Sequence, residues 1–436
     1  MLFRVLKSIL PSMLAFAFSG LYAIVDGFFI GQSIGDVGLA AVNIAFPLTV
    51  VIQAAGTGLG MGGAVELSLA RGRGEEAQVR RFLTNTLELL AVAGLVLLAV
   101  LQLICRPVLG VLGAEGAVLE ASIGYTRVIA LGAVFQCFAT GLAPLLRNYD
   151  GALAAMGAMI AGFVTNIVLD YLFVMVFSWG TPGAAWATII GQAVTVLPCA
   201  FCLSRRVGKV FRGDWLPRGE TIRTILKVAL SPFGLTLTPN LAILLLNKGA
   251  SLWGGATAVA AYAVVSYVTA VVQLLLQGVG DGSQPLMSLN IGMGRPQEAK
   301  QVRTIAYLCA GITAAGTMLA LFLLRGAVPG FFGASAEAAP LAAHSLPIFI
   351  LSFPFTAFCR TSTAYFYATQ KNRYAYCMIY GEPILLAAAM FLVLPRFWAL
   401  DGVWMSVPVV QAILTGLGLL FLRLDRTDAA NPKKEE

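Results

Sequence analysis

Charged side chains are scarce in this sequence. Only 11% of its 436 residues are Asp, Glu, Lys or Arg, whereas 58% are hydrophobic. A water-soluble chain carries about 25% charged residues, which cover its surface. The chain has too few charges to face water on all sides, so its composition predicts a polytopic membrane protein.

Histidine and nucleotide motifs are also lacking. The chain has one histidine and seven cysteines. The only close cysteine pair, Cys199 and Cys202, has no second pair beside it, so a zinc site lacks ligands and these residues are expected to fill helices. No G-x-x-x-x-G-K-[ST] phosphate loop occurs, which leaves ATP drive unsupported. We therefore expect no resident cofactor and no enzyme activity.

Apolar runs long enough to cross a bilayer, about 20 residues each, recur along the chain in two groups of six. We expect an N-terminal six-helix lobe at 1–204, a basic cytoplasmic linker at 205–224 and a C-terminal six-helix lobe with a short cytoplasmic tail at 225–436. The predicted spans are 8–32, 39–66, 82–105, 120–146, 153–178, 183–204, 225–250, 256–284, 301–325, 340–368, 374–397 and 401–424.

The basic residues orient these spans. The chain has a formal net charge of +8, which suits the inner loops of a membrane protein better than a nucleic-acid surface. With both termini cytoplasmic, the outer side receives only Arg106, Arg127, Lys248, Arg325 and Arg396. We expect a multi-pass protein of the cytoplasmic (inner) membrane that binds no nucleic acid. The inner side would hold Arg71, Arg73, Arg80, Arg81, Arg205, Arg206, Lys209, Arg212, Arg218, Arg295, Lys300, Arg303, Lys371, Arg373, Arg423, Arg426, Lys433 and Lys434.

The two halves repeat each other. GLGMGGAVELSLARGRG, from Gly58, and GVGDGSQPLMSLNIGMG, from Gly278, agree at seven of seventeen positions. A shift of six helices keeps both halves in the same orientation, so they should be related by an axis along the membrane normal. Two such lobes favour alternating access, and hence a carrier over a channel. The glycines themselves predict close helix packing.

Several polar residues lie where hydrocarbon should exclude them. Asp26 stands alone in the first span, where an unpaired charge costs roughly 3 kcal/mol. Asn166 and Asp170 are four residues apart on one helix face, and Thr188 lies in the next span. These oxygen ligands suit Na⁺, while two close carboxylates can instead share a proton. The alternative is that each residue is merely hydrogen-bonded within the helix packing.

The second half does not copy this set. Aligning GAAW at Gly183 with GVWM at Gly402 places Ala389 opposite Asp170 and Leu385 opposite Asn166. Coupling chemistry is therefore expected in the first half alone.

Other polar residues have separate expectations. Glu382 could contact a cationic substrate or pair with Arg360, and Tyr22 and Asn43 are further candidates for substrate or gating contacts. Asp281 is expected to cap the glycine-rich turn. Arg147, like Arg360, is expected to reach lipid headgroups from a helix end.

Several motifs together resemble the multidrug and toxic compound extrusion (MATE) family, over about residues 8–424. They are VDGFFIGQSIGDVGLAAVNIAFPL, ARGRG, LLRNYDG, NIVLDYLF and GAAWAT. The resemblance implies an all-α fold of twelve transmembrane helices, in two six-helix bundles related by pseudo-two-fold symmetry around a V-shaped central cavity. It also implies export of organic, often cationic, small molecules in exchange for Na⁺ or H⁺.

The family's cation site falls on Asp26, Asn166, Asp170 and Thr188. The seventh span lacks the acid that some branches carry there, which favours the branches with a site in the first lobe. We expect a transporter that works as a monomer surrounded by membrane lipid. The alternative is a lipid-linked oligosaccharide flippase of the same superfamily, which should carry cationic residues in its cavity, whereas acids dominate here.

Overall fold

The computed structural model describes residues 1–208 and 215–430, with the side chains of 23, 27, 28, 31, 34, 36 and 426–430 left undescribed. Every regular element in these ranges is helical. Lys209, Arg212, Lys433 and Lys434, which were assigned to the inner side, lie outside the described residues, as does the side chain of Arg426. The all-α prediction is confirmed.

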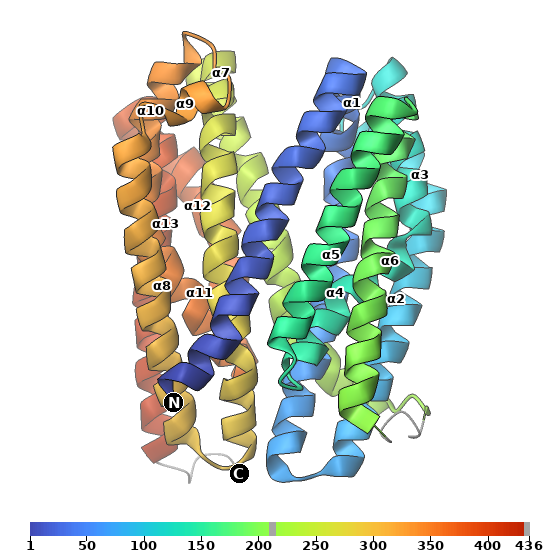
Figure 1. Ribbon diagram of the computed structural model, residues 1–436. Helices are drawn as coiled ribbons and strands as arrows, with labels where there is room; N and C mark the ends of the chain where they lie inside the picture. Colours follow the sequence, from blue (N-terminus) through green and yellow to red (C-terminus); the bar gives the residue numbers. More distant parts are fainter. Residues whose placement is uncertain (209–214, 431–436) are drawn as a thin grey trace. The chain divides into compact units, whose positions relative to one another are not determined.

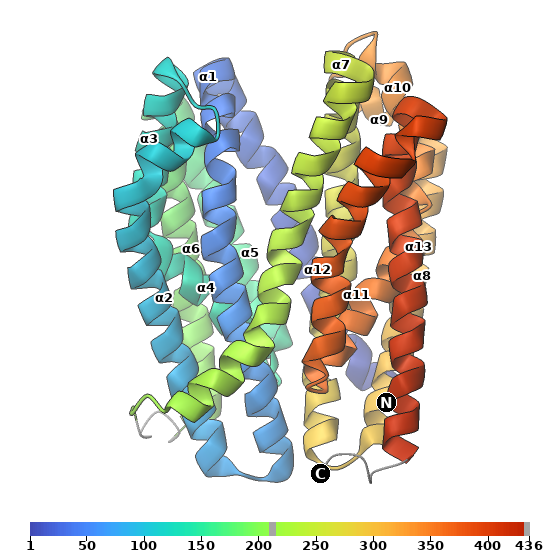
Figure 2. The same ribbon diagram turned by 180° about the vertical axis from the view of Figure 1, so that it is seen from behind.

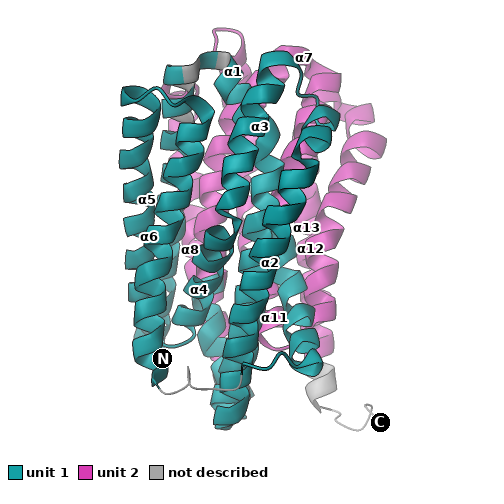
Figure 3. Cartoon of the chain, turned by 90° about the vertical axis from the view of Figure 1, so that its right-hand side faces the viewer, with its two compact units in different colours: residues 1–237, 281–300 teal, residues 238–280, 301–436 magenta. Residues whose placement is uncertain are grey.

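The chain forms two compact units (Figure 3). Unit 1 comprises residues 1–237 and 281–300, and unit 2 comprises 238–280 and 301–436. The helix α7 (Gly219–Gly292) is thus shared, because both of its ends belong to unit 1 and its middle to unit 2. This grouping divides the chain elsewhere than the lobe boundary expected at 205–224, which rests on the internal repeat and stays a prediction.

Unit 1 is a bundle of helices lying side by side (Figures 1 and 2). Besides the ends of α7, it holds α1 (Leu2–Arg73), α2 (Glu76–Val111), α3 (Gly116–Leu131), α4 (Ala133–Arg147), α5 (Ala152–Asp170), the π-helix η1 (Tyr171–Val176) and α6 (Gly180–Val207).

Unit 2 holds the middle of α7 and all later elements, apart from the first residues of α8. They are α8 (Pro296–Leu324), α9 (Val328–Phe331), α10 (Ala338–Ile350), α11 (Phe353–Ala368), α12 (Asn372–Ala388), the π-helix η3 (Ala389–Val393) and α13 (Pro395–Ala430).

The number of membrane spans follows from these helices. Nine helices in the described part are long and apolar enough to cross a membrane, and counting each bent pair as one span gives eleven. The pairs are α3 with α4, bent by 57°, and α10 with α11, bent by 47°. One of the nine, α7, is itself divided by a non-helical glycine, Gly255, which brings the eleven to the expected twelve. The protein is a multi-pass membrane protein, and the V-shaped cavity stays a prediction.

The internal repeat extends to the backbone. The break in α1 at Gly35 (φ 68°, ψ −153°) matches the break in α7 at Gly255 (φ 64°, ψ −158°), at the same spacing in the chain as Gly58 and Gly278. Glycine lacks the Cβ that makes this region costly for other residues. Three further pairs at this spacing share positive φ: Gly74 with Gly294, Gly113 with Gly333, and Asp150 with Gln370.

Close helix packing in unit 1 depends on glycine, as the sequence predicted. A Cβ added to Gly60 in α1 would overlap the Cα and carbonyl oxygen of Gly141 in α4 and lie 2.7 Å from its carbonyl carbon. Small residues at such crossings let backbones approach closely within a bilayer. The adjoining core is apolar and includes Leu90, Cys137 and Leu59.

Candidate cation site

Three helices of unit 1 supply the four residues expected to bind a cation. Asp26 lies in α1, Asn166 and Asp170 lie in the last turns of α5, and Thr188 lies in α6. The helices α1, α5 and α6 pack against one another. This packing draws side chains from distant parts of the sequence into one place.

The four side chains form one connected group. The carboxyl groups of Asp26 and Asp170 are close enough to interact directly. Asn166 Nδ2 donates to Thr188 Oγ1 at 3.4 Å, and Thr188 Oγ1 donates to the carbonyl of Ala184 at 3.0 Å. Tyr22 lies near Asp26, Asp170 and Thr188. The predicted set is therefore brought together.

Several oxygen atoms of this group lack a hydrogen-bond partner among the described residues. Among the described residues, no hydrogen bond reaches Asp26 Oδ1, Asn166 Oδ1 or either carboxylate oxygen of Asp170. Nor does any described Lys, Arg or His form an ion pair with either acid. Asp170 is fully buried and Asn166 is 3% exposed. A buried acceptor without a partner costs about 1–3 kcal/mol, and more when it is charged.

This arrangement favours a binding site over hydrogen-bonded packing, and the cation site itself stays a prediction. Hydrogen-bonded packing would have satisfied the side chains, as it does for the Thr188 hydroxyl. Instead, four acceptor atoms are left unsatisfied in one place. Such a group can accept a metal cation through its oxygens or take up a proton on a carboxylate.

Aromatic rings surround the acids. Tyr22, a predicted substrate or gating contact, stacks on Phe163 with the ring centroids 5.4 Å apart and the planes at 9°. Tyr125 of α3 is 7% exposed and lies near both Asp26 and Asp170. The sequence analysis missed Tyr125, since a lone tyrosine in an apolar span carries no signal until α3 is placed against α1 and α6.

The helix geometry changes next to the acid. The α-helix α5 ends at Asp170 and continues directly as the π-helix η1. Ser33 Oγ of α1 donates to the carbonyl of Val174 within η1 at 2.8 Å. Single π turns inside α-helices occur frequently at functional sites. Asp170 therefore lies at a backbone irregularity that is held from a neighbouring helix.

The remaining candidates lie elsewhere. Asn43 is exposed on α1. Glu382, in unit 2, accepts a hydrogen bond from Gln411 Nε2 at 2.8 Å and interacts electrostatically with Arg360. Glu382 thus lies near Arg360, and its contact with a cationic substrate stays a prediction.

Two expectations about charged residues are wrong. Arg147 and Arg360 do not extend to the lipid surface, since they are only 6% and 8% exposed. Asp281 does not cap the glycine-rich turn but pairs with Arg147, with Oδ2 3.9 Å from Nη2. An arginine near a helix end can either extend to the headgroups or pair with an acid. Here Arg147 is buried beside Asp281 of another helix.

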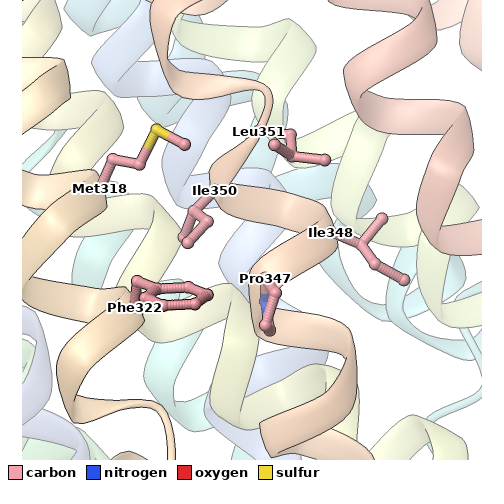
Figure 4. A pocket seen from close by; sticks show the side chains of 6 residues that line it. All are labelled: Met318, Phe322, Pro347, Ile348, Ile350 and Leu351. Atoms are coloured by element: carbon pink, nitrogen blue, oxygen red, sulfur yellow. The ribbon is translucent and has the colours of Figure 1, made fainter.

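A hollow of about 240 Å³ in unit 2 offers no such chemistry (Figure 4). It is lined by Met318 and Phe322 of α8, by Pro347, Ile348 and Ile350 of α10, and by the adjoining Leu351. All six side chains are apolar, so the hollow has no side-chain ligand for a cation.

The fold and the site together define a class: an all-helical, multi-pass membrane protein with an internal repeat and a buried acidic site in its first half. The family model MatE matches residues 11–172 and 238–387, which is more than half of the chain, with one matched stretch in each half. The protein belongs to the MATE family, and the resemblance seen in the sequence is confirmed.

Known proteins resemble the chain over almost its whole length. It is 22% identical to the multidrug export protein MepA of Staphylococcus saprophyticus over 420 residues, 95% of this chain and 92% of that protein. It is also 22% identical to MepA of Staphylococcus aureus strain MRSA252 over 421 residues, 96% of this chain and 93% of that protein.

Two solved structures share the fold. One is an outward-facing multidrug resistance MATE family transporter of the MOP superfamily, with a TM-score of 0.92 and 22% identity over 98% of this chain and 96% of that one. The other is a MOP superfamily transporter from Pyrococcus furiosus, whose binding pocket was reported to have reverse polarity that suggests a different function. Its TM-score is 0.91 and its identity 22%, over the same shares.

Proposed function

We propose that the protein is an antiporter that exports organic small molecules, cationic or amphipathic in character, in exchange for Na⁺ or H⁺. The observation that carries this proposal is the Asp26–Asp170 pair, in which three buried carboxylate oxygens have no hydrogen-bond partner among the described residues, with Asn166 and Thr188 beside it. The names of the MepA relatives as multidrug export proteins support an export function. We further propose a cytoplasmic-membrane location with both termini inside, which follows from the basic residues of the sequence.

The acid pair would couple the two movements. A cation that enters from outside neutralises charge at the acids and favours the conformation that releases the organic substrate. When the cation leaves on the inner side, the carboxylates repel each other again and substrate affinity returns. The coupling requires cation and substrate to prefer different conformations, because a ligand of equal affinity for both shifts neither.

Dye efflux from vesicles tests this function. Purified protein is reconstituted into vesicles, and ethidium movement is followed first under a Na⁺ gradient at uniform pH and then under a pH gradient without Na⁺. We expect an inwardly directed gradient of one of these ions to drive ethidium in the opposite direction. The gradient that succeeds identifies the coupling ion.

A matched acid provides the control. Glu120 is 64% exposed and pairs with Arg106 at a helix end, so Glu120→Gln should leave ethidium movement unchanged. If neither gradient moves the dye through the parent protein, the antiport proposal fails and the flippase becomes the better hypothesis.

Thr188 gives a finer test of the site. Thr188→Ala removes the hydroxyl that accepts from Asn166, a contact worth about 1 kcal/mol, or roughly a fivefold change in affinity. We expect the ion concentration for half-maximal efflux to rise by about that factor. Thr188→Ser keeps the hydroxyl and should stay near the parent value. Equal behaviour of the two variants would show that this hydroxyl does not support the site.

A further inference from the structure

The glycine motifs that reveal the repeat meet inside unit 1. A Cβ added to Gly72, near the end of α1, would lie 2.5 Å from the carbonyl oxygen of Leu289 in α7, and one added to Gly292 would overlap the carbonyl of Leu69. Gly72 and Gly292 occupy the same position in the two repeats. The two motif ends therefore cross with backbone against backbone.

A second pair of equivalent glycines extends this contact. A Cβ on Gly282 would lie 2.7 Å from Cα of Ile9, and a Cβ on Gly62 would lie 2.8 Å from the backbone nitrogen of Ala229. Ile9 and Ala229 are also equivalent in the repeat. Each motif thus accommodates the first helix of the other repeat.

Buried polar bonds hold residues 281–292 against the ends of α1 and α4. Arg147 Nη2 lies 3.9 Å from Asp281 Oδ2. Asn148 Nδ2 donates to Gln284 Oε1 at 3.0 Å, and Gln284 Nε2 donates to Asn148 Oδ1 at 3.3 Å. Other bonds run from Ser68 Oγ to Asn148 Oδ1 (2.5 Å), from Gln284 Nε2 to Ser288 Oγ (2.9 Å) and from Ser8 Oγ to the carbonyl of Gly282 (2.6 Å).

The contact layer, which is the contact of residues 281–292 with the ends of α1 and α4, is more polar than a permanently buried core. Gln284 and Ser288 are fully buried, and Asn148 and Asp281 are only 3% and 4% exposed. Apolar residues of similar volume often stabilise such a position as well as a buried ion pair does. Polar partners can exchange their bonds for water when the surfaces separate, which apolar partners cannot do.

The path of α7 also links residues 281–292 to unit 2. Residues 281–292 belong to unit 1, while the preceding part of the same helix, 256–280, belongs to unit 2. A change in the path of α7 would therefore act directly on the contact layer.

We propose that residues 281–292 form a reversible latch, which closes the inner end of the transport path and undocks from Arg147, Asn148 and the glycines of α1 when that end opens. The proposal rests on the proposed transport function and on the predicted orientation. Breaking the latch exposes the buried polar side chains to water from the inner face.

Thiol labelling tests the latch. Ser288→Cys is introduced into a full-length chain whose seven native cysteines are replaced and whose melting temperature matches that of the parent. A membrane-impermeant maleimide is then applied to inverted and right-side-out vesicles. We expect slow labelling with an intact latch. Arg147→Ala, which removes the Arg147–Asp281 ion pair, should raise the labelling rate at least about tenfold, from the inner face only.

Charge exchange and a glycine control separate a latch from general unfolding. The double variant Arg147→Asp with Asp281→Arg should restore slow labelling. Gly72→Ala should speed labelling, because its methyl group meets the Leu289 backbone, whereas Gly157→Ala, with open space at its Cβ, should not.

Three labelling results would contradict the latch. Unchanged labelling in Arg147→Ala, labelling from the outer face, or no recovery in the double variant would overturn the latch. Labelling needs no transported substrate, so loss of dye movement with the expected labelling pattern would count against the proposed function alone.

Discussion

Replacing Asp170 with asparagine should abolish ion-driven export while leaving the protein folded. The substitution keeps the shape of the side chain and removes a carboxylate from the proposed cation site, where a bond to a charged group would be worth up to about 3 kcal/mol. We therefore expect cation affinity to fall about 100-fold, and ethidium efflux from cells or vesicles to fall to the level of vesicles without protein. Asp26→Asn should have the same effect, because the proposed site places both carboxyl groups on the same ion.

The same substitution should raise thermal stability in the absence of the ion. Asp170 is fully buried, and its oxygens have no partner among the described residues. A carboxyl group buried here must either stay charged without a partner or take up a proton, and either opposes folding more than an amide in its place does. Melting measured in detergent should show Asp170→Asn at or above the parent.

The coupling ion should raise the melting temperature of the parent but not of the variant, because a ligand stabilises only the state that binds it. Glu120→Gln again serves as the control. An asparagine variant that exports at the parental rate, or one that melts well below the parent, would contradict the assignment of Asp170 to the site.

Gly60→Ala should cost about 3 kcal/mol of stability, near the upper end for overpacking. The added methyl group overlaps backbone atoms of Gly141, which cannot rotate away as a side chain could. The helices α1 and α4 would have to move apart along the apolar core that they share. Much less folded protein and a clearly lower melting temperature are expected, measured by fluorescence-detected size-exclusion chromatography of heated samples.

The matched control is Gly157→Ala in α5, where an added Cβ meets nothing within 4 Å. Alanine favours helix over glycine by about 1 kcal/mol, so this variant should be as stable as the parent or slightly more stable. If both variants melt alike, close packing at Gly60 is not what holds α1 and α4 together.

The sequence predicted those features that the hydrocarbon environment imposes most strongly. Twelve spans follow from apolar length, and the structure agrees once the break at Gly255 is counted. Asp26 and Asp170 were singled out because an intramembrane acid is costly, and the structure brings them together. In both cases one large energetic term outweighs every competing one.

Features that depend on tertiary partners could not be predicted in the same way. Arg147 near a helix end can reach headgroups or pair with an acid, and only the position of Asp281 decides the outcome. Tyr125 joined the site only when α3 was placed beside α1 and α6. The 57° bend between α3 and α4 was also missed, because hydropathy records the length of an apolar run and not its direction.

The second repeat keeps the π-helix η3 at Ala389–Val393, where the first has η1 at Tyr171–Val176, although Ala389 stands opposite Asp170. The irregular turn therefore does not need an acid, or any ion bound to one, in order to form. The second half thus keeps the π-helical turn but lacks the acid that stands beside it in the first half. The backbone geometry of the site and its charge can therefore change independently in evolution.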